Sequence, residues 1–229
     1  MTRPTTSTTG QYEVETGSRL RYRLLVWDFD GTLADTMALA LLTYNAMATR
    51  HGFRPVEDVD AARRMTVWSF LRRHEIPPIR LPQLAREYLS AIRGRMAGIR
   101  LYDGVPHMLR TLQAAGCRLG VLSSNTAENI AACFQANGVE DLFGFVICYP
   151  RLFGKERAIR KLLQREGLQP KHILYVGDEV RDVKAARKAG VDIAAVAWGF
   201  HSLDLLSRYA PTYLWTKPSE VLPALVAGG

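Results

Sequence analysis

The sequence has few cysteines and no long run of apolar residues, and both absences exclude classes of protein. Its three cysteines, Cys117, Cys133 and Cys148, are odd in number and contain no Cys-x-x-Cys pair, which argues against a disulfide framework and a structural zinc site. No stretch approaches the roughly 18 uncharged apolar residues that a membrane span requires. We therefore expect a cytoplasmic protein with reduced thiols and no membrane partner.

The N-terminus also lacks the apolar core of a secretory signal. Residues 1–18 are rich in Thr and contain no acid before Glu13. We predict a flexible N-terminal segment here, with a transit peptide as the alternative.

Acidic residues are outnumbered in this chain, since 30 Lys and Arg against 22 Asp and Glu give a formal net charge of +8. Such a charge permits a nucleic-acid surface. The basic residues are mostly arginines scattered along the chain, so we favour a field that attracts small anions and predict no nucleic-acid partner. With 48% hydrophobic residues, the 229-residue chain can form one globular core with a modest insertion.

The distribution of apolar residues predicts an α/β fold. Residues 24–27 form a short apolar run before a turn signal, a pattern typical of a buried strand. Beyond Gly104, short apolar runs alternate with segments of helical periodicity, which predicts a Rossmann-like parallel sheet with helices on both faces. Further strands are predicted at residues 118–124, 145–148, 172–178 and 192–197, and helices at residues 105–115, 126–137, 155–166 and 180–189.

Residues 36–100 differ from the rest of the chain in the spacing of their apolar residues. Apolar residues recur there at helical spacing, breaks occur at Gly52, Pro55 and the Pro77-Pro78 pair, and no strand pattern is present. We predict a helical domain of three or four helices, inserted into a core domain made of residues 19–35 and 101–229.

Polar residues follow three of the predicted strands, and the ends of neighbouring parallel strands converge on one crevice. These residues are Asp28 and Asp30 after the first strand, Ser124 and Asn125 after the second, and Asp178 and Asp182 after the strand at 172–178. Close carboxylates repel one another unless a cation lies between them. With no Cys or His at ligand spacing, an all-oxygen set favours Mg²⁺, which in turn suits phosphoryl chemistry.

Each of these residues also has a purely structural interpretation. Asp30-Gly31 is a common turn, and Asp178 and Asp182 could supply the cap and first-turn charge of a helix. Ser124 could cap the helix that follows it, although its hydroxyl and the helix start would also suit a phosphate oxygen. Neither turn nor cap explains why the acids follow two separate apolar strands.

Lys155 is the first lysine of an arginine-rich chain and lies at a predicted helix start, after Phe153-Gly154. A surface lysine is one interpretation. The other is a point charge that neutralises a phosphate and orients a carboxylate.

The segment from Asp28 to Leu33, with the sequence DFDGTL, resembles the first motif of the haloacid dehalogenase superfamily of phosphatases. Ser124, Lys155 and the GDxxxD segment from Gly177 occur in the order of the second, third and fourth motifs. The resemblance covers about residues 22–200.

Two further features narrow the resemblance to the phosphoglycolate-phosphatase-like branch: the helical insertion after the first motif and the segment Gly154-Lys155-Glu156. Glu179 departs from the pattern, because many relatives carry Ser or Thr there. This departure bears on metal coordination rather than on the reaction class.

The resemblance implies a magnesium-dependent phosphatase that acts through an aspartyl-phosphate. Asp28 would be the nucleophile and Asp30 the general acid and base, while Ser124, Asn125 and Lys155 would hold the phosphoryl oxygens. It also implies that an Asp28 oxygen, the Asp30 backbone carbonyl and Asp178 ligate Mg²⁺, with Asp182 orienting them.

The helical insertion would correspond to the family's cap, a lid that carries substrate selectivity. Arg63 and Arg64, or Arg72 and Arg73, could reach a second anionic group of a small phosphorylated metabolite, and we select Arg64. A solvated helix face is the alternative for each pair. The expected assembly is a monomer or a homodimer.

The residues present argue against two other reactions on the same scaffold. A phosphonate hydrolase needs a cap lysine, and residues 36–100 contain none; a dehalogenase has no use for Asp30. A phosphomutase shares the full set of site residues and is the alternative enzyme, and a non-catalytic binding protein is the alternative outside enzymes.

Overall fold

The computed structural model describes residues 20–149 and 151–226. The flexible segment predicted for residues 1–18 therefore lies outside the described residues. Among the described residues, no helix combines the length and the apolarity needed to cross a bilayer.

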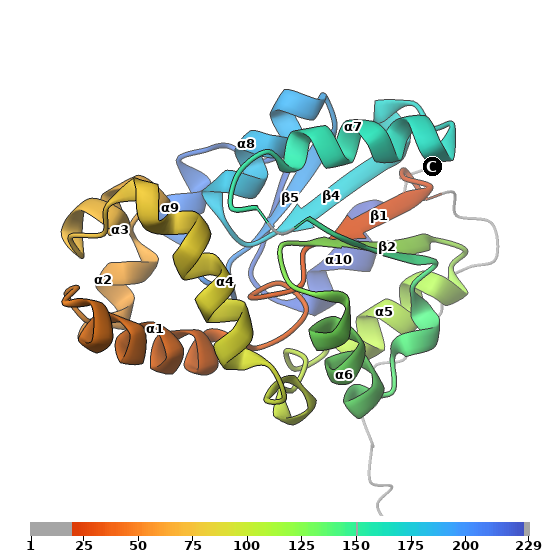
Figure 1. Cartoon of the computed structure of the whole chain (residues 1–229). Coiled ribbons are helices and arrows are strands. Elements are labelled where there is room, and N and C mark those ends of the chain that lie inside the picture. The colour runs from red at the N-terminus through yellow and green to blue at the C-terminus, as the bar shows by residue number, and fades with distance from the viewer. Residues whose placement is uncertain (1–19, 150, 227–229) are drawn as a thin grey trace, which may run out of the picture.

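A six-stranded parallel sheet forms the centre of the molecule, in the order β3-β2-β1-β4-β5-β6 (Figure 1). The strands are β1 (Leu24–Trp27), β2 (Arg118–Ser123), β3 (Phe145–Cys148), β4 (Ile173–Gly177), β5 (Asp192–Val196) and β6 (Tyr213–Trp215). Because β1 lies between β2 and β4, the polar residues that follow these three strands are brought to neighbouring positions at one edge of the sheet.

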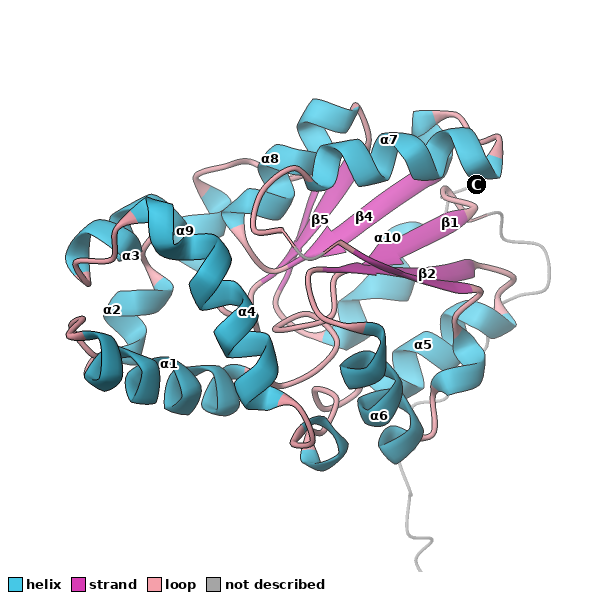
Figure 2. Ribbon diagram, in the orientation of Figure 1, coloured by secondary structure: helices cyan, strands magenta, loops and turns pink. Residues whose placement is uncertain are grey.

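Helices cover both faces of this sheet, as Figure 2 shows. The core helices are α5 (Val105–Ala114), α6 (Ala127–Asn137), α7 (Lys155–Glu166), α8 (Val180–Ala189), α9 (Leu203–Ser207) and α10 (Val221–Leu225). Leu25 and Trp27 of β1 pack on the side of α5, α6 and α10, while Leu24 and Val26 pack on the side of α7, α8 and α9. Strands buried on both faces explain the continuous apolar runs in the sequence.

The helical insertion lies beside the sheet and carries its own apolar cluster, made of Met47, Leu71, Ile76 and Leu84 (Figure 1). Its helices are α1 (Met37–His51), α2 (Val59–Arg63), α3 (Val67–Arg73) and α4 (Leu81–Ile92). Short 3₁₀ segments occur at Pro78–Arg80, Met96–Gly98, Glu140–Leu142, Pro170–His172 and Pro218–Glu220.

The predicted fold class is confirmed, and the predicted strands and core helices up to residue 197 are present with bounds shifted by one residue at most. Thr126 caps α6 by accepting a hydrogen bond from the Asn129 amide, as expected for a Thr at this position. The sequence did not predict β6, α9 and α10. Each has five residues or fewer, too short for a periodic pattern to emerge.

Candidate active site

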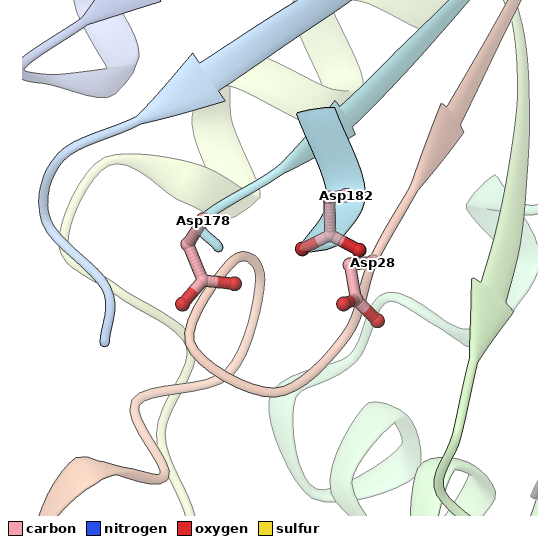
Figure 3. A group of neighbouring side chains, drawn as sticks. All are labelled: Asp28, Asp178 and Asp182. Carbon is pink, nitrogen blue, oxygen red and sulfur yellow. The ribbon is translucent and has the colours of Figure 1, made fainter. Parts of the chain in front are cut away.

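Three buried acids meet where β1, β4 and α8 come together (Figure 3). Asp28 follows β1, Asp178 follows β4, and Asp182 lies in the first turn of α8. One carboxylate oxygen of each lies within 4.8 Å of the other two, and all three side chains are almost completely buried. The sheet order therefore brings together acids that lie far apart in the sequence.

Lys155 supplies the cation at this cluster. It begins α7, directly after Gly154, whose φ of 98° is a conformation that suits glycine. Its Nζ donates hydrogen bonds to Asp28, to Asp182 Oδ1 at 2.8 Å and to the Tyr175 hydroxyl at 2.9 Å, and the side chain is 2% exposed. Burial alone would lower the pKa of Lys155, but the two carboxylates overcome this effect and raise the pKa well above its usual value. The lysine is therefore a fixed cation.

Asp178 is held by groups from two other loops. Its Oδ1 accepts a hydrogen bond from the Thr32 hydroxyl at 2.8 Å, and its Oδ2 accepts one from the Phe200 amide at 2.7 Å. The approach is so close that a Cβ on Gly31, whose φ is +74°, would lie 2.3 Å from Asp178 Oδ2. A Cβ on Gly199 would lie 2.1 Å from the Gly31 carbonyl oxygen. Both glycines are needed for the loops to close around this carboxylate.

Asp30 is turned towards the end of β2 rather than towards the acid cluster. Its carboxylate accepts hydrogen bonds from Asn125 Nδ2, the shorter at 3.0 Å. Asn125 is fixed in turn, because its Oδ1 accepts from the Thr126 amide and from Asn129 Nδ2, both at 2.8 Å. Burial and the charge of Asp28 raise the pKa of Asp30 to about 6. A carboxyl with this pKa can both donate and accept a proton near neutral pH.

The acid cluster carries a strong electrostatic cost. Burial raises the pKa of Asp178 well above its usual range, and the neighbouring charges of Glu179, Asp182 and Asp28 raise it further. Burial also raises the pKa of Asp28, with Asp182 adding to the rise and Lys155 opposing it. The charge of Lys155 therefore does not offset the negative charges of the three carboxylates. A divalent cation bound between them would do so.

The donor set fits a hard divalent cation such as Mg²⁺. All available ligand atoms are oxygens, and Asp28 and Asp178 approach from different strands with lone pairs free for a cation. Each carboxylate oxygen of the three acids accepts one hydrogen bond: Asp28 from the Phe29 amide and Lys155, Asp178 from the Thr32 hydroxyl and the Phe200 amide, and Asp182 from Lys155 and the Glu179 amide. A carboxylate oxygen has a second lone pair, so all three acids retain a site for a cation.

Ser124 and Arg64 are less buried than Lys155 and the three clustered acids, which the sequence also predicted for the site. Ser124 directly follows β2 and is half-buried at the same edge of the sheet. Arg64 directly follows α2 as its C-cap residue and is exposed. Its neighbour Arg63 reaches the core instead, because Arg63 Nη2 donates to the Ala197 carbonyl at 3.0 Å.

Tyr175, Arg181 and His201 were not identified from the sequence, and Glu179 was identified there only as a departure from the fourth motif. Tyr175 was part of an apolar strand pattern, yet its hydroxyl contacts Lys155. Glu179 forms a half-buried ion pair with Arg181 at 2.6 Å. His201, 6% exposed, accepts a hydrogen bond on Nδ1 from the Val180 amide at the start of α8. The departure at Glu179 was the only signal in the sequence that pointed to any of them.

Comparisons with known proteins agree with this geometry. The family model of haloacid dehalogenase-like hydrolases matches residues 25–196. The chain is 35% identical over 204 residues to a phosphoglycolate phosphatase of Synechococcus elongatus, covering 88% of this chain and 96% of that relative. It is 27% identical over 222 residues to an N-acetylmuramic acid 6-phosphate phosphatase of Pseudomonas aeruginosa, covering 90% and 96%.

The fold has close counterparts among solved structures. A haloacid dehalogenase-like family protein from Streptococcus pneumoniae superposes with a TM-score of 0.72 at 21% identity, covering 89% of this chain and 98% of that chain. At this identity the likeness concerns the fold alone.

Proposed function

Since the chain belongs to the family of haloacid dehalogenase-like hydrolases, we propose that it is a magnesium-dependent phosphatase that hydrolyses a small, phosphoglycolate-like phosphomonoester. The family resemblance inferred from the sequence motifs is confirmed. The observation that carries the proposal is the meeting of Asp28, Lys155 and Asp178 at one buried point.

Asp28 is the proposed nucleophile. Its Oδ1 is held by the Phe29 amide at 2.8 Å, and Lys155 contacts its Oδ2, so the carboxylate is fixed in orientation. An oxygen of Asp28 attacks phosphorus while the bond from phosphorus to the alcohol oxygen breaks, which gives an aspartyl-phosphate and the alcohol. Water then attacks this phosphorus and releases inorganic phosphate and the free carboxylate.

Asp30 is the proposed general acid and base. In the first step its carboxyl donates a proton to the departing alcohol oxygen, and in the second it takes a proton from the attacking water. Its pKa of about 6 and the hydrogen bonds from Asn125 support both roles.

Ser124 and Lys155 are the proposed ligands of the phosphoryl oxygens, with Asn125 positioning the end of β2. Lys155 places a fixed positive charge where negative charge develops during the transfer. Asp28, Asp178 and the Asp30 backbone carbonyl would hold Mg²⁺, and Asp182 would orient that set. The metal would offset the charge of the phosphoryl group.

The helical insertion at residues 36–100 is the proposed cap over a core of residues 19–35 and 101–229. Two contacts tie it to the core at Arg63: its Nη2 donates to Ala197, and its carbonyl accepts from the Ser202 amide at 3.0 Å. A cap anchored in this way can exclude water from the transfer and select the substrate. We also propose a cytoplasmic setting, which the three free cysteines support.

The direct test is release of inorganic phosphate from a panel of small phosphomonoesters. We expect turnover in millimolar Mg²⁺ and its loss in EDTA, with restoration when Mg²⁺ is added back. Absence of turnover on every member of the panel, or equal turnover in EDTA, would contradict the proposal.

Mg²⁺ is also expected to stabilise the folded protein. The like charges of Asp28, Asp178 and Asp182 are close only in the native state, so an ion that binds there favours that state. At 100 times its dissociation constant it would add about 2.7 kcal/mol, or about 5–11 °C in Tm for a chain of this size. Scanning calorimetry with and without Mg²⁺ measures the shift, and a Tm indifferent to millimolar Mg²⁺ would count against the metal site.

A further inference from the structure

A cavity of about 370 Å³ lies between the start of α3 in the helical insertion, the loop and first turn that begin α7, and one side of α8 as far as Lys188. Lys155 forms part of its wall, so the cavity reaches the residue that contacts Asp28. Trp68 of α3 and Phe153 of the loop also line it, with their rings stacked at 5.4 Å between centroids. Asp28 and Asp178 do not line it, so the cavity adjoins the acid cluster at Lys155 and is the place into which the group attached to a bound phosphate would extend.

The charged residues that line this cavity are mostly cationic. Among the residues that the structure describes, they are Lys155, Arg181, Lys184 and Lys188, against one acid, Glu156. The ammonium group of Lys155 is already paired with two carboxylates. The other three cations lie on one face of α8, because residues spaced by three and four positions are neighbours on a helix. Such a lining attracts an anion in addition to the phosphoryl group.

Arg181 is the best fixed of these cations, because its side chain is only 14% exposed, while Lys184 and Lys188 are exposed. Its Nη2 pairs with Glu179, and its Nη1 donates to the Leu152 carbonyl at 3.3 Å. Among the described residues, its buried Nε has no hydrogen-bond partner. A guanidinium carries five N–H donors in a planar fork, so donors remain for a carboxylate or phosphate oxygen.

Arg181 also lies close to the acids of the site. Burial raises the pKa of both Asp28 and Asp30, and the charge of Arg181 counters part of each rise. Its position is determined by Glu179, which accepts from the guanidinium and occupies the N-cap of α8. Glu179, the residue that departs from the fourth motif, thus pairs with an arginine that lines the cavity.

We propose that Arg181, positioned by Glu179, binds a second anionic group on the alcohol part of the substrate. This inference rests on the proposed function and assigns the residue that recognises the carboxylate, or a similar anion, on the alcohol part of a phosphoglycolate-like substrate. Recognition then comes from the core, through α8, rather than from the exposed Arg64 of the helical insertion.

The test compares 2-phosphoglycolate with ethyl phosphate, which lacks the carboxylate but has the same length. Glu179→Gln/Arg181→Gln removes both charges together, so that no buried charge is left unpaired. We expect the ratio of kcat/KM for 2-phosphoglycolate to that for ethyl phosphate to fall about tenfold or more, mainly through KM, because a charge-assisted hydrogen bond is lost. Glu179→Gln alone keeps an acceptor for the guanidinium and should retain most of the preference.

Arg157→Gln is the matched control, because Arg157 is exposed on α7 two residues from Lys155 but does not line the cavity. It removes a cationic group of the same kind as Arg181, although the double variant also removes an acid, and it should leave the ratio unchanged. A double variant that keeps the wild-type ratio, or an equal fall of the ratio in the control, would overturn the role of Arg181.

Binding separates this inference from the proposed function. Calorimetric titration is done in the Asp28→Asn background, in which 2-phosphoglycolate should bind in Mg²⁺ without being hydrolysed, and we expect the Kd to become about tenfold weaker when Glu179→Gln/Arg181→Gln is added. Equal dissociation constants would overturn the role of Arg181 even if the enzyme hydrolyses phosphomonoesters. A weaker Kd together with no turnover by the wild type would support Arg181 while contradicting the phosphatase.

Discussion

Asp28→Asn is expected to reduce phosphatase turnover by about 10⁴-fold or more. The amide oxygen that replaces the carboxylate is a far weaker nucleophile, so the aspartyl-phosphate cannot form. The fold should survive, because the amide oxygen can still accept the hydrogen bond of the Phe29 amide, and Lys155 keeps its pairing with Asp182. Release of p-nitrophenol from p-nitrophenyl phosphate measures the loss, and calorimetry verifies the folded state.

The matched control for this prediction is Asp141→Asn, the same substitution at an exposed acid in a 3₁₀ segment. It should retain wild-type turnover, since surface substitutions away from a site have small effects. If Asp28→Asn hydrolyses p-nitrophenyl phosphate as fast as the wild type does, Asp28 is not the nucleophile. A thermal transition as cooperative as that of the wild type excludes unfolding as the cause of the loss.

The order of strands and helices was predictable because the signals are local. An apolar run of four residues marked β1, and Gly167 and Gly190 marked the ends of α7 and α8 through their left-handed conformation. The family was predictable as well, because its motifs are short and lie at strand ends. Such signals depend on neighbouring residues in the sequence and need no knowledge of the tertiary structure.

Contacts between distant segments were not predictable in the same way. Tyr175 lies in a buried strand like any apolar residue, and only the position of α7 shows that its hydroxyl reaches Lys155. Glu179 and Arg181 are two residues apart, but the sequence does not show that the guanidinium is held beside the cavity. The same limit applies to Arg63, because its contact with Ala197 depends on where the helical insertion sits on the core.

The acid cluster shows that burying several like charges side by side costs stability. Asp28, Asp178 and Asp182 are buried side by side with one lysine between two of them, and burial with like charges raises the pKa of both Asp28 and Asp178. In a protein selected for stability alone, a neutral residue would serve better at one of these positions. Retention of all three acids is therefore explained by the chemistry that we propose for them.

Asp178→Asn is expected to lower the turnover and, in the absence of metal, to raise the stability of the folded protein. In Mg²⁺, turnover should fall by about 10³-fold or more, because the proposed metal set loses a charged ligand. In EDTA the same variant should be more stable than the wild type by about 1 kcal/mol, or about 2–4 °C in Tm, because a buried like charge is gone. The side-chain oxygen of the variant can still accept from the Phe200 amide, and its Nδ2 can donate to the Thr32 hydroxyl, which turns to accept.

The gain in stability should depend on pH in a direction fixed by the raised pKa of Asp178. Below about pH 3 the wild-type carboxyl is largely protonated in both states and costs little. Because the pKa of Asp178 is higher in the folded state, the unfolded chain releases this proton at a lower pH than the folded chain does, so the wild type loses stability as pH rises. The Asp178→Asn variant has no proton to release at this position. The difference in Tm in EDTA should therefore be larger at pH 8 than at pH 5, while Asp141→Asn shows no such trend. A variant less stable than the wild type at every pH would mean that the hydrogen bonds to Asp178 outweigh the repulsion within the cluster.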